Sequence, residues 1–60
     1  MAEFEIYLDK DGDWRWRFCA ANGEIMADSG EGYEDRDDCE RAIEIIREAA
    51  ATAPLREVKS

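Results

Sequence analysis

The chain has 60 residues and carries 16 acidic against eight basic side chains, which gives a net charge of −8 at pH 7. A chain of this length forms one domain, so we treat residues 1–60 as a single unit. The negative charge repels nucleic-acid phosphates and anionic lipids, which argues against both as partners. We find no apolar run of membrane length and no signal peptide, and we expect a cytoplasmic protein.

The type of charge leaves two interpretations open. Only two of the eight basic residues are lysines, and an acid-rich, lysine-poor surface is typical of proteins from salt-loving archaea. The cytoplasm of these archaea is concentrated salt, in which charges are screened over a few ångströms, so the repulsion between acidic side chains of one chain is suppressed. The alternative is an ordinary acidic cytosolic domain, and folding that tightens in molar KCl would distinguish the halophilic protein from it.

Residues 3–8 alternate with a period of two, which predicts a first strand. Phe4, Ile6 and Leu8 fall on one face, and Glu3, Glu5 and Tyr7 fall on the other. The acidic stretch 9–13 that follows resembles the start of an EF-hand loop. Counted from Asp9, however, Trp14 stands where glycine is needed and Ala20 where a bidentate glutamate is needed. We therefore expect a polar β-turn and no calcium site.

The stretch 14–29 predicts a hairpin, because two alternating runs flank Asn22-Gly23. A two-residue type I′ turn would set Ala21 opposite Glu24. The pairs expected beyond the turn are Ala20 with Ile25, Cys19 with Met26, Phe18 with Ala27, Arg17 with Asp28 and Trp16 with Ser29. The apolar face would then collect Trp14, Trp16, Phe18, Ala20, Ile25 and Ala27. The mixed face would collect Arg15, Arg17, Cys19, Glu24, Met26 and Asp28.

The first strand can extend this hairpin into a three-stranded meander. Pairing Leu8 with Trp14, Ile6 with Trp16 and Phe4 with Phe18 places all six side chains on the apolar face. The same register aligns Glu5, Arg17 and Asp28 as a charge ladder on the other face. Arg15 and Arg17 could clamp an anion, but because acidic partners fall in register we favour structural pairing.

A helix follows the sheet, so the predicted fold is α+β: a three-stranded antiparallel meander with one helix packed on one face, β-β-β-α. Asp35 is the expected N-cap and the helix is expected to run to about Ala51. Its predicted buried stripe contains Cys39, Ala42, Ile43, Ile46, Ala49 and Ala50. The loop 29–33 could present backbone N–H groups to an anion, but neighbouring acids oppose this, and we expect a packed connection with Tyr33 against the helix. Residues 55–59 could form a short extra strand or a tail.

No catalytic or metal-binding constellation is present in the sequence. The chain contains no histidine and no CxxC, and neither Cys19 nor Cys39 has an obvious base or reaches the other. We therefore predict no enzyme activity, no catalytic, cofactor-binding or metal-binding residue and no cofactor, with both thiols reduced.

The stretch from Phe4 to about Ile46 resembles the YegP-like family of small uncharacterised domains. The matching residues are Phe4, Ile6, Tyr7, Gly12, Trp14, Arg15, Trp16, Arg17, Asn22, Gly23, Ile25, Ser29, Gly30, Glu31, Gly32, Tyr33, Cys39 and Ile43. The resemblance implies a β-β-β-α unit. Many members look like two such units in tandem, so a chain with one copy is expected to form a homodimer. The family supplies no established activity.

The sequence thus predicts an uncharacterised, non-enzymatic homodimeric module for interaction or regulation. For so short a chain, burial and chain ordering nearly cancel, which favours self-association. We expect Trp14, Met26 and Ile45 at the dimer interface, since they are surplus to one small core, and we expect Tyr33 there as well, because its loop would face the partner subunit. The partner beyond the second copy is an unknown protein or small molecule. The alternative function is a small-molecule binding protein with its site at the dimer seam.

Overall fold

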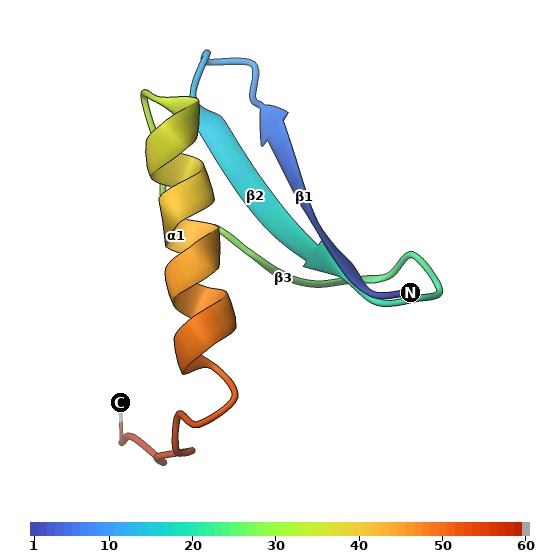
Figure 1. The fold of residues 1–60 in the computed structure, drawn as a ribbon, viewed down its shortest axis with the longest axis vertical. Helices are drawn as coiled ribbons and strands as arrows, with labels where there is room; N and C mark the ends of the chain where they lie inside the picture. The colour runs from blue at the N-terminus through green and yellow to red at the C-terminus, as the bar shows by residue number, and fades with distance from the viewer. Residues whose placement is uncertain (60) are drawn as a thin grey trace.

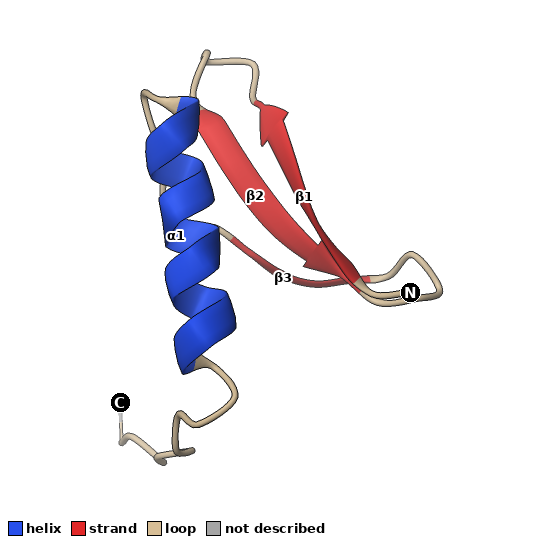
Figure 2. Cartoon of the chain, in the orientation of Figure 1, coloured by secondary structure: helices blue, strands red, loops and turns tan. Residues whose placement is uncertain are grey.

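The structure, a computed structural model, describes residues 1–59. Three strands precede one helix: β1 (Glu3–Leu8), β2 (Trp14–Cys19), β3 (Ile25–Asp28) and α1 (Arg36–Ala49). The sheet order is β1-β2-β3 with antiparallel neighbours. Helix α1 stands on one side of the sheet (Figure 1), and Figure 2 shows the helix and sheet as separate layers. The predicted α+β fold is confirmed.

The first hairpin has the predicted register. Ile6 lies opposite Trp16, and Phe4 lies opposite Phe18. Two backbone hydrogen bonds close the loop: the N–H of residue 9 donates to the carbonyl of residue 13 at 2.8 Å, and the Gly12 N–H donates to the carbonyl of residue 9 at 3.0 Å. Gly12 has φ +84°, so the loop is a type I turn closed by a left-handed glycine.

The second hairpin has the same loop, and the predicted type I′ turn is wrong. The Gly23 N–H donates to the Ala20 carbonyl at 2.9 Å, and the Ala20 N–H donates to the Glu24 carbonyl at 2.8 Å. Gly23 has φ +90°, whereas Asn22 stays at negative φ and its Oδ1 accepts the Glu24 N–H at 3.0 Å. The loop therefore has three residues instead of two, and Ala20, not Ala21, faces Glu24.

A β-bulge in β3 compensates for the longer loop. Cys19 lies opposite Ile25 and Phe18 lies opposite Ala27, which leaves Met26 as the extra residue. Beyond the bulge the predicted pairing of Arg17 with Asp28 is confirmed. Before it, the predicted partners of Cys19 and of Ile25 are wrong. Because opposed residues share a face, Ile25 lies beside Cys19 on the outer face and not on the apolar face.

The loop after β3 is tied to β2 by its backbone. The Trp14 N–H donates to the Tyr33 carbonyl at 2.7 Å, and the Tyr33 N–H donates back at 2.9 Å. Ser29 is buried, and its Oγ lies 3.3 Å from the Trp16 N–H, which it accepts. Asp35 is the N-cap residue in extended conformation, but its side chain makes no capping hydrogen bond. The loop is the packed connection that the sequence predicts.

The core is centred on β2 and the first half of α1. Trp16, Cys39 and Ile43 are buried, and the partly buried residues packed on them are Phe4, Ile6, Trp14, Phe18, Tyr33 and Ile46. Helix α1 approaches β2 and β1 but has no Cα within 8 Å of β3. Ala49 and Ala50 are consequently exposed, contrary to the predicted stripe, and Leu8 is also exposed.

The segment 50–59 follows the helix and is exposed throughout. It contains no strand, so of the two interpretations left open for residues 55–59, the tail is the one observed in this chain. Leu55 is 95% exposed and Val58 is 66% exposed.

Candidate functional site

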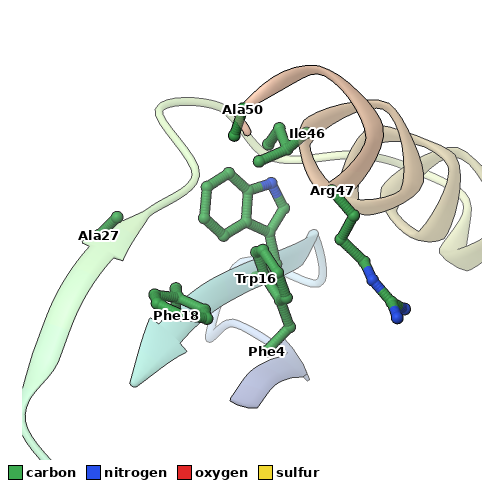
Figure 3. Close-up of a pocket in the computed structure, with 7 residues that line it drawn as sticks. All are labelled: Phe4, Trp16, Phe18, Ala27, Ile46, Arg47 and Ala50. Atoms are coloured by element: carbon green, nitrogen blue, oxygen red, sulfur yellow. The ribbon is translucent and has the colours of Figure 1, made fainter. Parts of the chain in front are cut away.

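An apolar cleft opens between the sheet and the C-terminal half of α1. Its lining residues are Phe4, Trp16, Phe18, Ala27, Ile46, Arg47 and Ala50, and its volume is about 260 Å³. Figure 3 shows the Trp16 ring standing between the strands and the last turns of α1, with Ala27 on the opposite side. The cleft exists because α1 does not reach β3, so the inner face of that strand lacks a cover.

Aromatic rings form the floor of the apolar cleft. The Phe4 and Trp16 rings meet edge to face at 5.7 Å between centroids, and the Phe4 and Phe18 centroids are 4.8 Å apart. Arg47 lies at the rim and pairs with Glu44 at 3.3 Å, where both side chains are exposed. Apart from Arg47, every lining side chain is apolar. The cleft can therefore bury apolar surface but offers no acid–base pair and no nucleophile.

The four predicted interface residues are not brought together, and none of them lines the apolar cleft. Trp14 is half-buried, with the Arg36 guanidinium 5.6 Å above its ring. Tyr33 is half-buried against the core. Met26 is 65% exposed on β3 and Ile45 is 59% exposed on α1. Their place in an interface stays a prediction.

The arginines of the outer sheet face are engaged by local acids. Arg17 Nε donates to Glu5 Oε1 at 2.7 Å, and its guanidinium lies 4.8 Å from the centre of the Tyr7 ring. The hydrogen bond from Arg17 lowers the pKa of Glu5. The predicted third member of the ladder, Asp28, lies opposite Arg17 but forms no ion pair with it in the described part of the chain. The structural interpretation of Arg17 is supported by this contact.

Asp9 organises the first hairpin loop. Its Oδ1 accepts the backbone N–H groups of Asp11 and Asp13, both at 2.9 Å, and its Oδ2 accepts Arg15 Nε at 2.6 Å. The Arg15 hydrogen bond, followed by the backbone bond from Asp13, holds the pKa of Asp9 below its ordinary value. The carboxylate is thus engaged within the turn, in agreement with the predicted polar β-turn.

We expect Asp9→Asn to remove part of the acid sensitivity of folding. A carboxyl whose folded pKa is lowered contributes stability above its unfolded pKa of about 3.9, and that contribution is lost as pH falls through the folded pKa. Thermal unfolding from neutral pH down to pH about 2 measures this. The variant is expected to be less stable at neutral pH and to lose less stability on acidification. Asp11→Asn, which leaves the Arg15 contact intact, is the control, and an equal slope in the two variants would contradict the account.

The cysteines lie apart and are free thiols. Cys39 is a residue of α1 and is fully buried in the core, and burial raises its pKa. Cys19 is buried on the outer face, and burial, together with the nearby Glu5 carboxylate, raises its pKa. Both thiols are therefore held protonated, which is the opposite of what a nucleophilic or metal-binding cysteine requires.

The segments described contain no helix long and apolar enough to cross a membrane. Within residues 1–59, no three histidine, cysteine, aspartate or glutamate side chains gather as a metal site would require.

Comparison with known proteins places this fold in a family. The sequence model of one protein family, the domain of unknown function DUF1508, matches residues 9–57. The UPF0339 protein NMB1088 of Neisseria meningitidis is 46% identical over 55 residues, covering 92% of this chain and 96% of that protein. A solution structure of a protein from Haloferax volcanii is 38% identical, with a TM-score of 0.87 over 95% of both chains.

A longer relative also matches. The UPF0339 protein from the ptx operon 5′ region of Stutzerimonas stutzeri is 43% identical over 47 residues, which are 78% of this chain but 41% of that protein. The matches agree with the YegP-like pattern, and the chain belongs to the DUF1508, or UPF0339, family of small uncharacterised proteins.

Proposed function

We propose that the protein is a non-enzymatic homodimeric interaction module in which a second copy covers the apolar cleft. The cleft carries this proposal: beside the buried Trp16 it leaves Phe4 and Phe18 only partly covered, because α1 does not reach β3. Exposed apolar surface of this kind, bounded by a polar rim, marks a protein interface. The high acidic charge makes such an association dependent on salt.

The C-terminal segment supplies the complementary surface. Leu55 and Val58 are 95% and 66% exposed on the tail that follows α1, and the tail begins at Ala50, which lines the cleft. A cleft of about 260 Å³ is just below the 300–1,000 Å³ typical of small-molecule sites, and it suits one or two aliphatic side chains. We therefore place Leu55 and Val58 of each copy in the cleft of the other.

A family member offers separate support for pairing. The matched 47 residues make up 41% of the Stutzerimonas stutzeri protein, which is therefore about 115 residues long and has room for two such units. Two copies of the 60-residue chain would together hold the same two units.

Sedimentation equilibrium at micromolar concentration tests the dimer. The wild-type chain is expected to be dimeric, Leu55→Asp/Val58→Asp to be monomeric with unchanged circular dichroism, and Thr52→Asp/Ala53→Asp, with the same added charge on the same segment, to remain dimeric. Association is expected to strengthen in molar KCl. A monomeric wild-type chain in both dilute buffer and molar KCl would refute the proposal.

A small-molecule site at the dimer seam is the alternative, favoured by the aromatic floor of the cleft. A thermal-shift screen of metabolites separates the two functions. A module that binds only protein is expected to show no hits, whereas a metabolite that stabilises the wild type but not Ala27→Asp would establish the alternative.

A further inference from the structure

We propose that the open edge of β1 and the groove between β1 and α1 bind an extended segment, rich in lysine or arginine, of another protein. The segment would add to the sheet as a fourth strand beside β1. Such a basic segment would be the partner of the interaction module proposed above, and the proposal rests on that function. It uses the edge of the sheet remote from β3, so the two surfaces can be tested separately.

The backbone of β1 is free to accept a strand. Within residues 1–59 only β2 pairs with β1, which forms the margin of the sheet in Figure 1. The N–H groups of Trp14 and Trp16 donate to the loop after β3 and so point away from β1. Because bonded pairs alternate along an antiparallel ladder, the residues opposite them, Leu8 and Ile6, direct their N–H and C=O groups outward. Phe4 continues this alternation.

Apart from the charged side chains of Glu3 and Glu5, the β1 edge lacks the features that usually prevent strand addition. It runs for six residues with no proline, no lysine and no break in its register. The other edge, β3, has four residues and carries the bulge at Met26. Strand addition is therefore favoured at β1.

A groove lies along the inner side of this edge. Its lining residues are Phe4, Ile6, Arg36, Glu40, Ile43 and Glu44, and its volume is about 200 Å³. A residue that pairs with Phe4 or Ile6 projects its side chain from the same face and so enters the groove. There it meets an aliphatic and aromatic floor, lined also by two carboxylates and the Arg36 guanidinium, so the charged side chains of the groove sum to −1.

Lysine and arginine fit this groove, because their aliphatic stems pack on apolar surface while their charged groups reach the rim. Glu40 and Glu44 each have one exposed arginine partner, at 3.2 Å from Arg36 and 3.3 Å from Arg47. A carboxylate has further acceptor capacity for a second cation. The net charge of −8 adds long-range attraction for a basic segment.

The test is an NMR titration of the ¹⁵N-labelled 60-residue chain with capped octapeptides of alternating lysine and threonine. We expect saturable shifts along β1 and around Glu40 and Glu44, weakening with salt. Lysines whose side chains enter the groove direct their backbone N–H groups toward β1, so N-methylation of these backbone amides is expected to abolish binding. The backbone N–H groups of the threonines face away from β1, so their N-methylation is expected to preserve binding. A glutamate–threonine peptide is expected not to bind.

Protein variants provide the matched comparison. Glu40→Gln/Glu44→Gln is expected to weaken binding about fivefold, the equivalent of two exposed ion pairs, whereas Glu24→Gln/Glu48→Gln, with the same change in charge, is not. No saturable binding, equal binding of the two methylated peptides, or equal weakening in the two double variants would each overturn the groove proposal. Sedimentation of the same samples measures the dimer separately. A monomer that binds the peptide would contradict only the dimer proposal. Loss of the dimer in Glu40→Gln/Glu44→Gln would instead assign the groove to a second copy and overturn the proposal of a basic segment.

Discussion

Replacing Trp16 by alanine is expected to remove most of the free energy of unfolding. Trp16 is 8% exposed, joins α1 to the sheet and contacts Phe4 edge to face. Truncating a buried tryptophan costs about 3–5 kcal/mol. A domain of 60 residues has about 3–9 kcal/mol in total at 0.05–0.15 kcal/mol per residue. Urea unfolding followed by the fluorescence of Trp14, the remaining tryptophan, measures the loss.

Ile45→Ala is the control for Trp16→Ala, because Ile45 is an apolar side chain that is 59% exposed. Its effect on the free energy of monomer unfolding is expected to be within about 0.5 kcal/mol, as for surface positions generally. Equal losses at the two positions would show that Trp16 is not the centre of the core.

Adding one methyl group at Gly32 is expected to cost about 1–3 kcal/mol, the usual range for overpacking. A Cβ at Gly32 would lie 2.7 Å from the Cβ and 3.0 Å from the Cγ of Asp13. These are fixed atoms near the backbone, so either the turn or the connection to α1 must move. The neighbouring bonds between Trp14 and Tyr33 would be strained by that movement. Thermal unfolding of Gly32→Ala measures the cost.

Gly30 provides the matched control two residues away. A Cβ there meets nothing within 4 Å, so Gly30→Ala is expected to be neutral or slightly stabilising. Asp13→Gly removes the opposing side-chain atoms. In that background the destabilisation caused by Gly32→Ala is expected to be smaller than in the wild type. Destabilisation by Gly30→Ala as large as that by Gly32→Ala would contradict a steric cause.

The register of β1 and β2 could be predicted because both strands alternate over six residues. A shift by one residue would place Arg15 and Arg17 in the core, so only one pairing is tolerable. The second hairpin contains less information. Ile25 and Met26 are both apolar, so the pattern of β3 does not reveal which of them is the bulged residue. The longer loop and the bulge cancel beyond Phe18, and the predicted pairs there are correct for that reason.

The apolar cleft could not be predicted from periodicity. Helical spacing shows that Ala49 and Ala50 share a face with Ile43 and Ile46, but it does not show where along the helix the sheet ends. The two alanines extend beyond the packed region and are exposed. The small side chains at the end of the stripe were the available signal, since alanines fill little of the space between a helix and a sheet.

The turns show how local chemistry can be misjudged. Asn-Gly favours a type I′ turn, yet the Asn22 side chain instead accepts the Glu24 N–H and only Gly23 takes positive φ. The first loop has the same form, with glycine three residues after the residue that opens it. That shared spacing of Gly12 and Gly23 was visible in the sequence and indicates the same three-residue loop in both hairpins.

The account depends on a second chain filling the space beside Trp16. Isotope-filtered NOE spectroscopy on a mixture of labelled and unlabelled protein observes contacts between copies directly. We expect intermolecular NOEs from the ring protons of Phe4 and Phe18 to the methyl groups of Leu55 and Val58. Absence of any intermolecular NOE to these rings at millimolar concentration, in dilute buffer and in molar KCl, would contradict the account.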